Sequence, residues 1–128
     1  MPRRSYDQYC AVARALDAVG ERWSLLIVRE LLDGPRRYTD LHADLPGVST
    51  DILATRLKQL EGEGVVVRRK LERPANAVVY QLTEHGLMLR RVVAALGDWG
   101  LGVLGEQRPT DAVREHWVTG DPAGAVEG

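Results

Sequence analysis

The sequence predicts a mainly α-helical domain that carries one small β-hairpin. Apolar residues recur at helical spacing over most of the first 61 positions, and β-branched residues gather between positions 65 and 83. The chain has 128 residues, 45% of them hydrophobic and 27% charged, which is enough for one apolar core. We assign residues 1–105 to a single domain and the polar residues 106–128 to a mobile tail.

Two helices are predicted in the first quarter of the chain. Apolar residues recur at helical spacing from residue 9 to residue 19, and Gly20 ends this helix. The next helix, residues 21–32, is apolar nearly all round and carries Trp23 on its main apolar face, which is typical of a central buried helix. Residues 33–35 (Asp-Gly-Pro) end it.

The next two helices are joined by a tight turn. A short helix is predicted over residues 38–44, and residues 45–48 (Leu-Pro-Gly-Val) form the turn. Ser49 then offers its hydroxyl to the free amides of a helix over residues 50–61. Three leucines follow one another along one face of this helix, which predicts that this face is buried. They are Leu53, Leu57 and Leu60.

A hairpin and a last helix complete the domain. Residues 65–71 and 78–83 have the composition of strands, and residues 72–77 contain the proline and asparagine that suit a hairpin tip. Thr83 caps a long helix over residues 84–104, whose glycines weaken its intrinsic propensity. Three helices, a tight turn before the fourth helix, and then a hairpin predict a winged helix-turn-helix.

Charge is distributed unevenly along the chain. The formal net charge is −1, but the residues after Gly105 hold two basic and five acidic side chains, which leaves 15 basic and 13 acidic side chains before them. A basic cluster lies on or beside the predicted hairpin at residues 68–73. The local field near the hairpin is therefore positive although the whole chain is nearly neutral.

The helix over residues 50–61 has the features of a major-groove reader. Its leucine face packs inward and leaves a polar face free, and a helix of this diameter fits the major groove of B-DNA. Cations of the hairpin are expected on the flanking backbone or minor groove, and Arg36 and Arg37 are expected to hold a phosphate. The predicted DNA-contacting residues are Arg36, Arg37, Ser49, Thr50, Asp51, Thr55, Arg56, Lys58, Arg68, Arg69, Lys70 and Arg73.

A winged helix can also serve protein interaction without direct DNA binding. An interaction module should replace the exposed cations of the wing with apolar or acidic residues. Arg68, Arg69 and Lys70 stand in the wing of this chain, which favours DNA. The interaction module remains the alternative function.

The same residues resemble the HxlR-type regulators, which are relatives of the MarR group. The matching segments are residues 10–16, 20–27, 34–41, 48–61 and 80–86. The resemblance implies a transcriptional regulator that binds double-stranded DNA as a homodimer, with the first and last helices pairing across a two-fold axis. Repression is the expected sign, because a compact dimer can act by occupying a promoter. The expected interface residues are Val12, Leu16, Val92, Leu96 and Trp99.

Two kinds of effector are compatible with the sequence. In some members of the resembled family the cysteine that matches Cys10 senses oxidants or electrophiles, and a thiol at a helix N-terminus is favoured as thiolate. The other interpretation of Cys10 is a small apolar residue packed at the start of the first helix. A small-molecule effector between the subunits is the competing hypothesis.

Other classes of function are not favoured. The chain has no P-loop, dinucleotide fingerprint or nucleophile elbow, and His42, His85 and His116 are widely spaced. We therefore expect neither enzyme activity nor a metal or cofactor. No apolar run reaches the ~18 residues that span a bilayer, and the N-terminus lacks a secretory signal, so a cytoplasmic location without membrane contact is expected.

Overall fold

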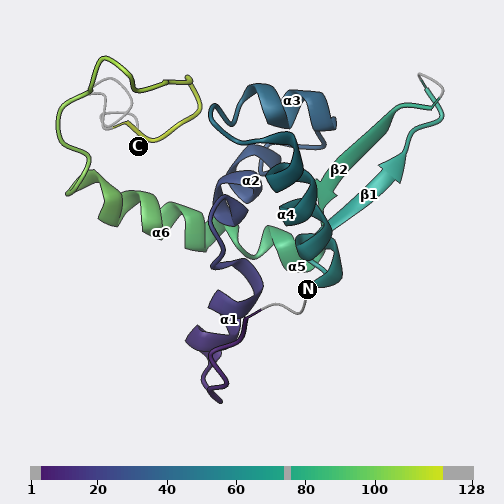
Figure 1. The fold of residues 1–128 in the computed structure, drawn as a ribbon, viewed down its shortest axis with the longest axis horizontal. Coiled ribbons are helices and arrows are strands. Elements are labelled where there is room, and N and C mark those ends of the chain that lie inside the picture. Colours follow the sequence, from purple (N-terminus) through teal and green to yellow (C-terminus); the bar gives the residue numbers. More distant parts are fainter. Residues whose placement is uncertain (1–3, 74–75, 120–128) are drawn as a thin grey trace. The chain divides into compact units, whose positions relative to one another are not determined.

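The computed structural model describes residues 4–73 and 76–119 (Figure 1). Residues 74–75 of the predicted hairpin tip and residues 120–128 of the predicted tail lie outside the described residues. The chain forms two compact units, one ending at Arg90 and the other beginning at Arg91.

The described elements are mainly helical with one hairpin, as the sequence predicts (Figure 1). The last helix begins at the final residue of the first unit and continues into the second. The order of elements is that of a winged helix-turn-helix. The elements are α1 (Ala11–Val19), α2 (Ser24–Leu31), α3 (Tyr38–Ala43), α4 (Thr50–Gly62), β1 (Val66–Lys70), β2 (Val78–Leu82), α5 (Glu84–Leu87) and α6 (Arg90–Leu101).

The core of the first unit forms around α2 and α4, which contact each other and the hairpin. Ile27 and Val28 of α2 have no exposed surface. The leucine face of α4 is buried with them, since Leu53, Leu57 and Leu60 are each exposed by 1% or less. The predicted inward face of this helix is confirmed, and the opposite face of α4 is left to solvent.

The two strands form an antiparallel hairpin, and the segment before α3 makes a short backbone bridge to β2. The register runs from Val66 opposite Leu82 to Lys70 opposite Val78. The segment before α3 adds a short bridge, in which the Arg36 N–H donates to the Tyr80 carbonyl (3.0 Å) and the Tyr80 N–H donates to the Arg36 carbonyl (2.7 Å). These two bonds attach the wing to the start of the helix-turn-helix.

The second helix begins three residues later than the sequence predicts. Trp23 adopts the left-handed conformation with φ 81° and ψ −19°, which a regular helix does not allow. The predicted helix over residues 21–32 is therefore wrong at its start: α2 begins at Ser24, and Trp23 lies in the turn before it. The reason is a backbone conformation that side-chain periodicity does not record.

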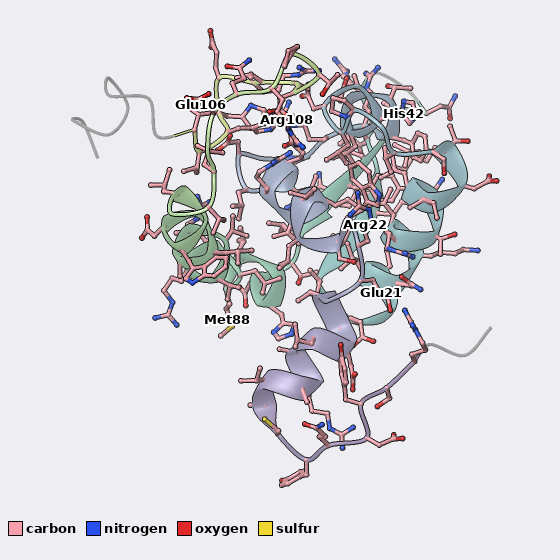
Figure 2. The ribbon with its side chains drawn as sticks, turned by 60° about the vertical axis from the view of Figure 1, so that its left-hand side comes forward. Glu21, Arg22, His42, Met88, Glu106 and Arg108 are labelled. Carbon is pink, nitrogen blue, oxygen red and sulfur yellow. The ribbon has the colours of Figure 1, made fainter. Side chains whose placement is uncertain are left out.

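The predicted long helix over residues 84–104 is also wrong, because the chain breaks it into α5 and α6. At the end of α5 the Met88 and Leu89 amides donate to the carbonyls three residues earlier, those of His85 and Gly86. Such bonds tighten the last turn and end a regular helix. Figure 2 labels Met88 at this break. At Gly86, a side chain would collide with the Val65 carbonyl oxygen, so α5 lies directly against the start of the hairpin.

The second unit consists of α6 and the chain that follows it. Arg108 and Asp111 form an ion pair (3.0 Å), and the Arg108 amide donates to the same carboxylate (2.8 Å). Val118 lies beside α6, where a Cβ atom at Gly97 would be 3.5 Å from its side chain. The described part of the predicted tail therefore makes contacts within its own unit.

A pair of glycine substitutions tests the packing of α5. Gly86→Ala should lower the free energy of unfolding by about 2 kcal/mol, because the new methyl group meets the Val65 backbone. Gly62→Ala, in a helical position with open space around it, should raise it by about 0.5–1 kcal/mol. Urea titrations of both variants measure the two changes. Equal effects of the two substitutions would contradict the close approach at Gly86.

Candidate nucleic-acid interface

The outward face of α4 is polar and open to solvent. Thr50, Asp51, Thr55 and Lys58 are exposed, and so is Ala54 between them. The side chains near the start of the helix are small, so that nothing on this face hinders close approach to another molecule. The candidate residues of α4, apart from Arg56, are thus brought together on one accessible surface.

The start of α4 is fixed by a side-chain cap. The Ser49 hydroxyl accepts a hydrogen bond from the Ile52 amide at 3.1 Å, and Ser49 itself has extended backbone angles. This arrangement is the predicted N-cap, and it is confirmed. The cap defines where the outward face of α4 begins.

Tyr38 connects the two helices of the helix-turn-helix, a contact that the sequence pattern does not predict. Its hydroxyl donates to the Thr50 carbonyl at 2.7 Å, and its ring stacks on His42 with the ring centroids 6.4 Å apart. Burial raises the pKa of Tyr38 above its usual value, and the neighbouring Asp51 and Tyr80 raise it further. An aromatic residue at the first position of α3 is the only signal for this contact in the sequence, and it gives no partner.

Arg56 is not on the outward face with the other candidates. Its side chain is only 14% exposed. Its Nε atom donates to the Arg22 carbonyl at 2.7 Å, and one terminal nitrogen donates to the Gln59 side chain at 3.3 Å. The other terminal nitrogen lies 3.9 Å from a Glu21 carboxylate oxygen. The guanidinium group is therefore directed toward the turn between α1 and α2, whose Glu21 and Arg22 are labelled in Figure 2.

The wing presents cations on both of its faces. Arg68, Arg69 and Lys70 are all exposed on β1, and Arg73 is exposed just beyond it. Successive side chains of a strand point to opposite faces, so Arg68 and Lys70 share one face and Arg69 lies on the other. A hairpin of this kind can meet negative charge from either side.

The two arginines before α3 differ in their surroundings. Arg36 is half-buried, and its Nε atom donates to the Glu30 carbonyl at 3.3 Å. Arg37 is exposed, and its backbone amide donates to the Asp40 carboxylate at 3.3 Å. Since the Arg36 side chain already donates to the Glu30 carbonyl and the Arg37 side chain is exposed, Arg37 is the better placed of the two to meet a phosphate.

Both terminal helices expose apolar side chains. On α1, Val12 is 69% exposed and Leu16 44%. On α6, Val92, Leu96 and Trp99 are exposed, the last by 71%. Each of the two helices therefore has an apolar surface that remains exposed to water in a single copy of its unit.

Cys10 stands immediately before α1 and is exposed, with no hydrogen bond from its side chain to the helix. The interpretation of Cys10 as a packed apolar residue is therefore wrong, because the thiol is open to solvent. In the described ranges, no three or more His, Cys, Asp or Glu side chains gather where they could hold a metal ion. No helix of the described chain is both long and apolar enough to cross a membrane.

A family model and a curated relative both identify this chain as similar to helix-turn-helix transcriptional regulators. The family model described as HxlR-like helix-turn-helix matches residues 18–108. The uncharacterized HTH-type transcriptional regulator YvaP of Bacillus subtilis (strain 168) is 37% identical over 86 residues, which are 67% of this chain and 80% of YvaP.

Solved structures of similar proteins agree with the fold. The redox regulator HypR in its oxidized form matches with a TM-score of 0.66 and 30% identity, over 71% of this chain and 94% of HypR. Quinone-bound YodB from B. subtilis matches with a TM-score of 0.60 and 34% identity, over 70% of this chain and 93% of YodB.

The Tyr38 contact makes stability depend on alkaline pH. Because the pKa of Tyr38 is raised in the folded state, its contribution is complete below the unfolded pKa of about 10 and is lost as the pH rises above that value. Tyr38→Phe should cost about 1 kcal/mol at neutral pH and should flatten the alkaline loss. Thermal melts from pH 7 to pH 11 measure both effects. Tyr9→Phe, at a fully exposed position, is the control; identical alkaline profiles for parent and Tyr38→Phe would refute the contact.

Proposed function

This chain belongs to the HxlR-like helix-turn-helix family, and on that premise we propose that it represses transcription by binding specific duplex DNA sequences as a homodimer. The family membership gives the class, that of transcriptional regulators. The proposal adds the mode of DNA contact, the assembly and the sign of regulation.

The observation that carries the proposal is the open polar face of α4 beside a cationic wing. One face of α4 is buried in the core, so the helix offers its other face as a rigid unit that fits a major groove. Thr50, Asp51 and Thr55 are exposed on that face, and the proposal assigns the contacts with base edges to them. Arg69 and its neighbours on β1 supply positive charge for the phosphates that flank the groove.

A protein-interaction module without DNA contact is the second candidate. It would need a docking surface on α4 and the wing in which apolar contact dominates. The wing instead exposes three consecutive cations on β1, at residues 68–70. Cations in this number favour a polyanion over an apolar protein surface.

A homodimer is supported by the apolar faces of the terminal helices. Val12 on α1 and Trp99 on α6 are more than two-thirds exposed, which is costly for side chains of this kind in water. Pairing of two copies through these helices would cover them and would place two copies of α4 on one duplex. Two-fold symmetric binding of this kind is common among helix-turn-helix proteins. A dimer that only occupies a promoter acts as a repressor.

An oxidant or electrophile is the effector that we propose first. Cys10 is exposed at the start of α1, a position that a dimer through α1 would place near the subunit boundary. The similar structures include a redox regulator, HypR, and a quinone-bound regulator, YodB. A non-covalent small molecule held between the subunits remains the competing effector.

The wing is tested by its effect on the salt dependence of binding. The double variant Arg68→Gln/Arg69→Gln should weaken binding about equally on all duplex sequences and lower the slope of log affinity against log salt by about 2. Fluorescence anisotropy at several salt concentrations measures the slope. Arg4→Gln/Arg14→Gln, which removes the same charge from exposed positions outside α4 and the wing, should leave it unchanged. A wing variant with the slope of this control would exclude phosphate contact by the wing and favour the interaction module.

The assembly is tested on α6. Leu96→Asp places a charge in the proposed apolar seam, so sedimentation velocity at micromolar concentration should show monomers in place of dimers. Val103→Asp, at an exposed apolar position just after α6, is the matched control and should leave the dimer intact. A Leu96→Asp protein that sediments as a dimer would place the interface elsewhere.

The effector is tested on the single thiol. Treatment with a quinone should weaken DNA binding of the parent at least about fivefold, because the adduct forms at the start of a helix in the dimer seam. Cys10→Ser should keep parental affinity and lose the response. Anisotropy before and after treatment measures it, and an equal response of both proteins would remove Cys10 from the mechanism.

A further inference from the structure

The turn between α1 and α2 holds a bulky residue in an uncommon backbone conformation. Trp23 has φ 81°, a left-handed conformation that residues with large side chains rarely adopt. The residues before it make no regular helix, and α2 starts directly after it at Ser24. Such a conformation persists only where surrounding contacts stabilise it, so the contacts made to this turn are needed to keep its backbone in place.

Helix α4 and the turn that leads into it contact the α1–α2 turn at two separate points. The Trp23 ring lies over the turn that leads into α4, where a Cβ atom at Gly47 would be 3.8 Å away from it. Further along, Arg56 of α4 donates to the Arg22 carbonyl, which is the peptide oxygen directly before Trp23. One contact lies before the first residue of α4 and the other near its middle, so together they fix the direction of the helix axis.

The Arg56 side chain is suited to hold a turn. Its planar fork presents several donors in a fixed geometry, and here it reaches Arg22, Gln59 and Glu21 at once. The short bond to the Arg22 carbonyl dominates, because the 3.9 Å ion pair with the partly exposed Glu21 is weak.

We propose that Arg56 is a positioning residue for DNA recognition: it fixes α4 against the α1–α2 turn and does not itself contact DNA. This inference rests on the proposed DNA binding. Exposed base-reading residues such as Thr55 adjoin Arg56 in the sequence, so a change in the tilt or rotation of α4 moves them relative to base edges. Base contacts require a precise approach, whereas phosphate attraction does not. Loss of Arg56 therefore lowers specific binding more than non-specific binding.

Lys58 on the same helix offers a matched comparison. It carries the same charge two residues away and is exposed on the outward face, where a phosphate contact is possible. If Arg56 were a phosphate contact, its loss would resemble the loss of Lys58. If it positions the helix, the two losses differ in their salt dependence and in their dependence on sequence.

The experiment compares Arg56→Met with Lys58→Met. Methionine keeps an unbranched apolar stem and removes the donors and the charge. The probes are a duplex selected by the parent protein from a random pool and a scrambled duplex of equal length, both titrated across salt concentrations. We expect Lys58→Met to weaken both duplexes and to lower the salt slope by about 1. We expect Arg56→Met to weaken the selected duplex about tenfold and the scrambled one less than about twofold, with a parental slope.

Two results would overturn the inference. One is an Arg56→Met protein that loses salt slope as Lys58→Met does, and the other is an Arg56→Met protein with parental affinity for the selected duplex. Should Arg56→Met fail to fold, Arg56→Lys decides in its place. Lysine keeps the charge but cannot bridge three partners, so the affinity of Arg56→Lys for the selected duplex should still fall about threefold. An Arg56→Lys protein with parental affinity for that duplex would show that only the charge of Arg56 matters and would overturn the inference.

Failure of the proposed function looks different from failure of this inference. Without DNA binding, the parent itself would select no duplex and show no salt-dependent affinity. A readout that needs no DNA remains in that case: amide hydrogen exchange in the 21–24 turn and in α4 should accelerate in Arg56→Met and stay parental in Lys58→Met. Equal exchange in both variants would show that Arg56 does not hold the turn.

Discussion

Burial of one face of α4 is the constraint on which the proposed interface depends. Leu53, Leu57 and Leu60 are almost completely removed from water against α2 and the hairpin. Full burial of one leucine contributes about 1.5–3 kcal/mol, so the three together are comparable to the net stability of a small domain. The helix therefore cannot turn its leucine face to solvent without losing most of that stability. Its polar face is held outward, with its start fixed by Ser49 and Tyr38.

Charge placement is the second basis for the proposed DNA contact. A net charge of −1 would argue against a polyanion if the charges were spread evenly. They are not, because β1 exposes three consecutive cations on a hairpin that two backbone bonds at Arg36 attach to the helix-turn-helix. The wing is thereby held to the same body as α4. The local positive field and the shape of this surface both favour the proposed contact with duplex DNA, and the overall charge of the chain does not decide the function.

The sequence predicts those features that local pattern controls. Helix α4, its leucine face and its Ser49 cap follow from spacing and residue type within a few positions, as do the two strands. The left-handed Trp23 and the break after α5 depend on contacts distant in the sequence, so periodicity extends both helices too far. Arg56 is adjacent to outward residues in the sequence, yet a carbonyl 34 positions away captures its guanidinium group. Only the folded chain could separate Arg56 from the exposed cations.

The most direct test of the account is an NMR titration of the ¹⁵N-labelled protein with a duplex that it selects from a random pool. The largest amide shifts should fall on residues 50–58 and 66–70, with smaller shifts at Arg37. Such a pattern would place the polar face of α4 and the cationic strand on the DNA together. Shifts concentrated elsewhere in the chain, with these two segments unmoved at saturation, would contradict the account.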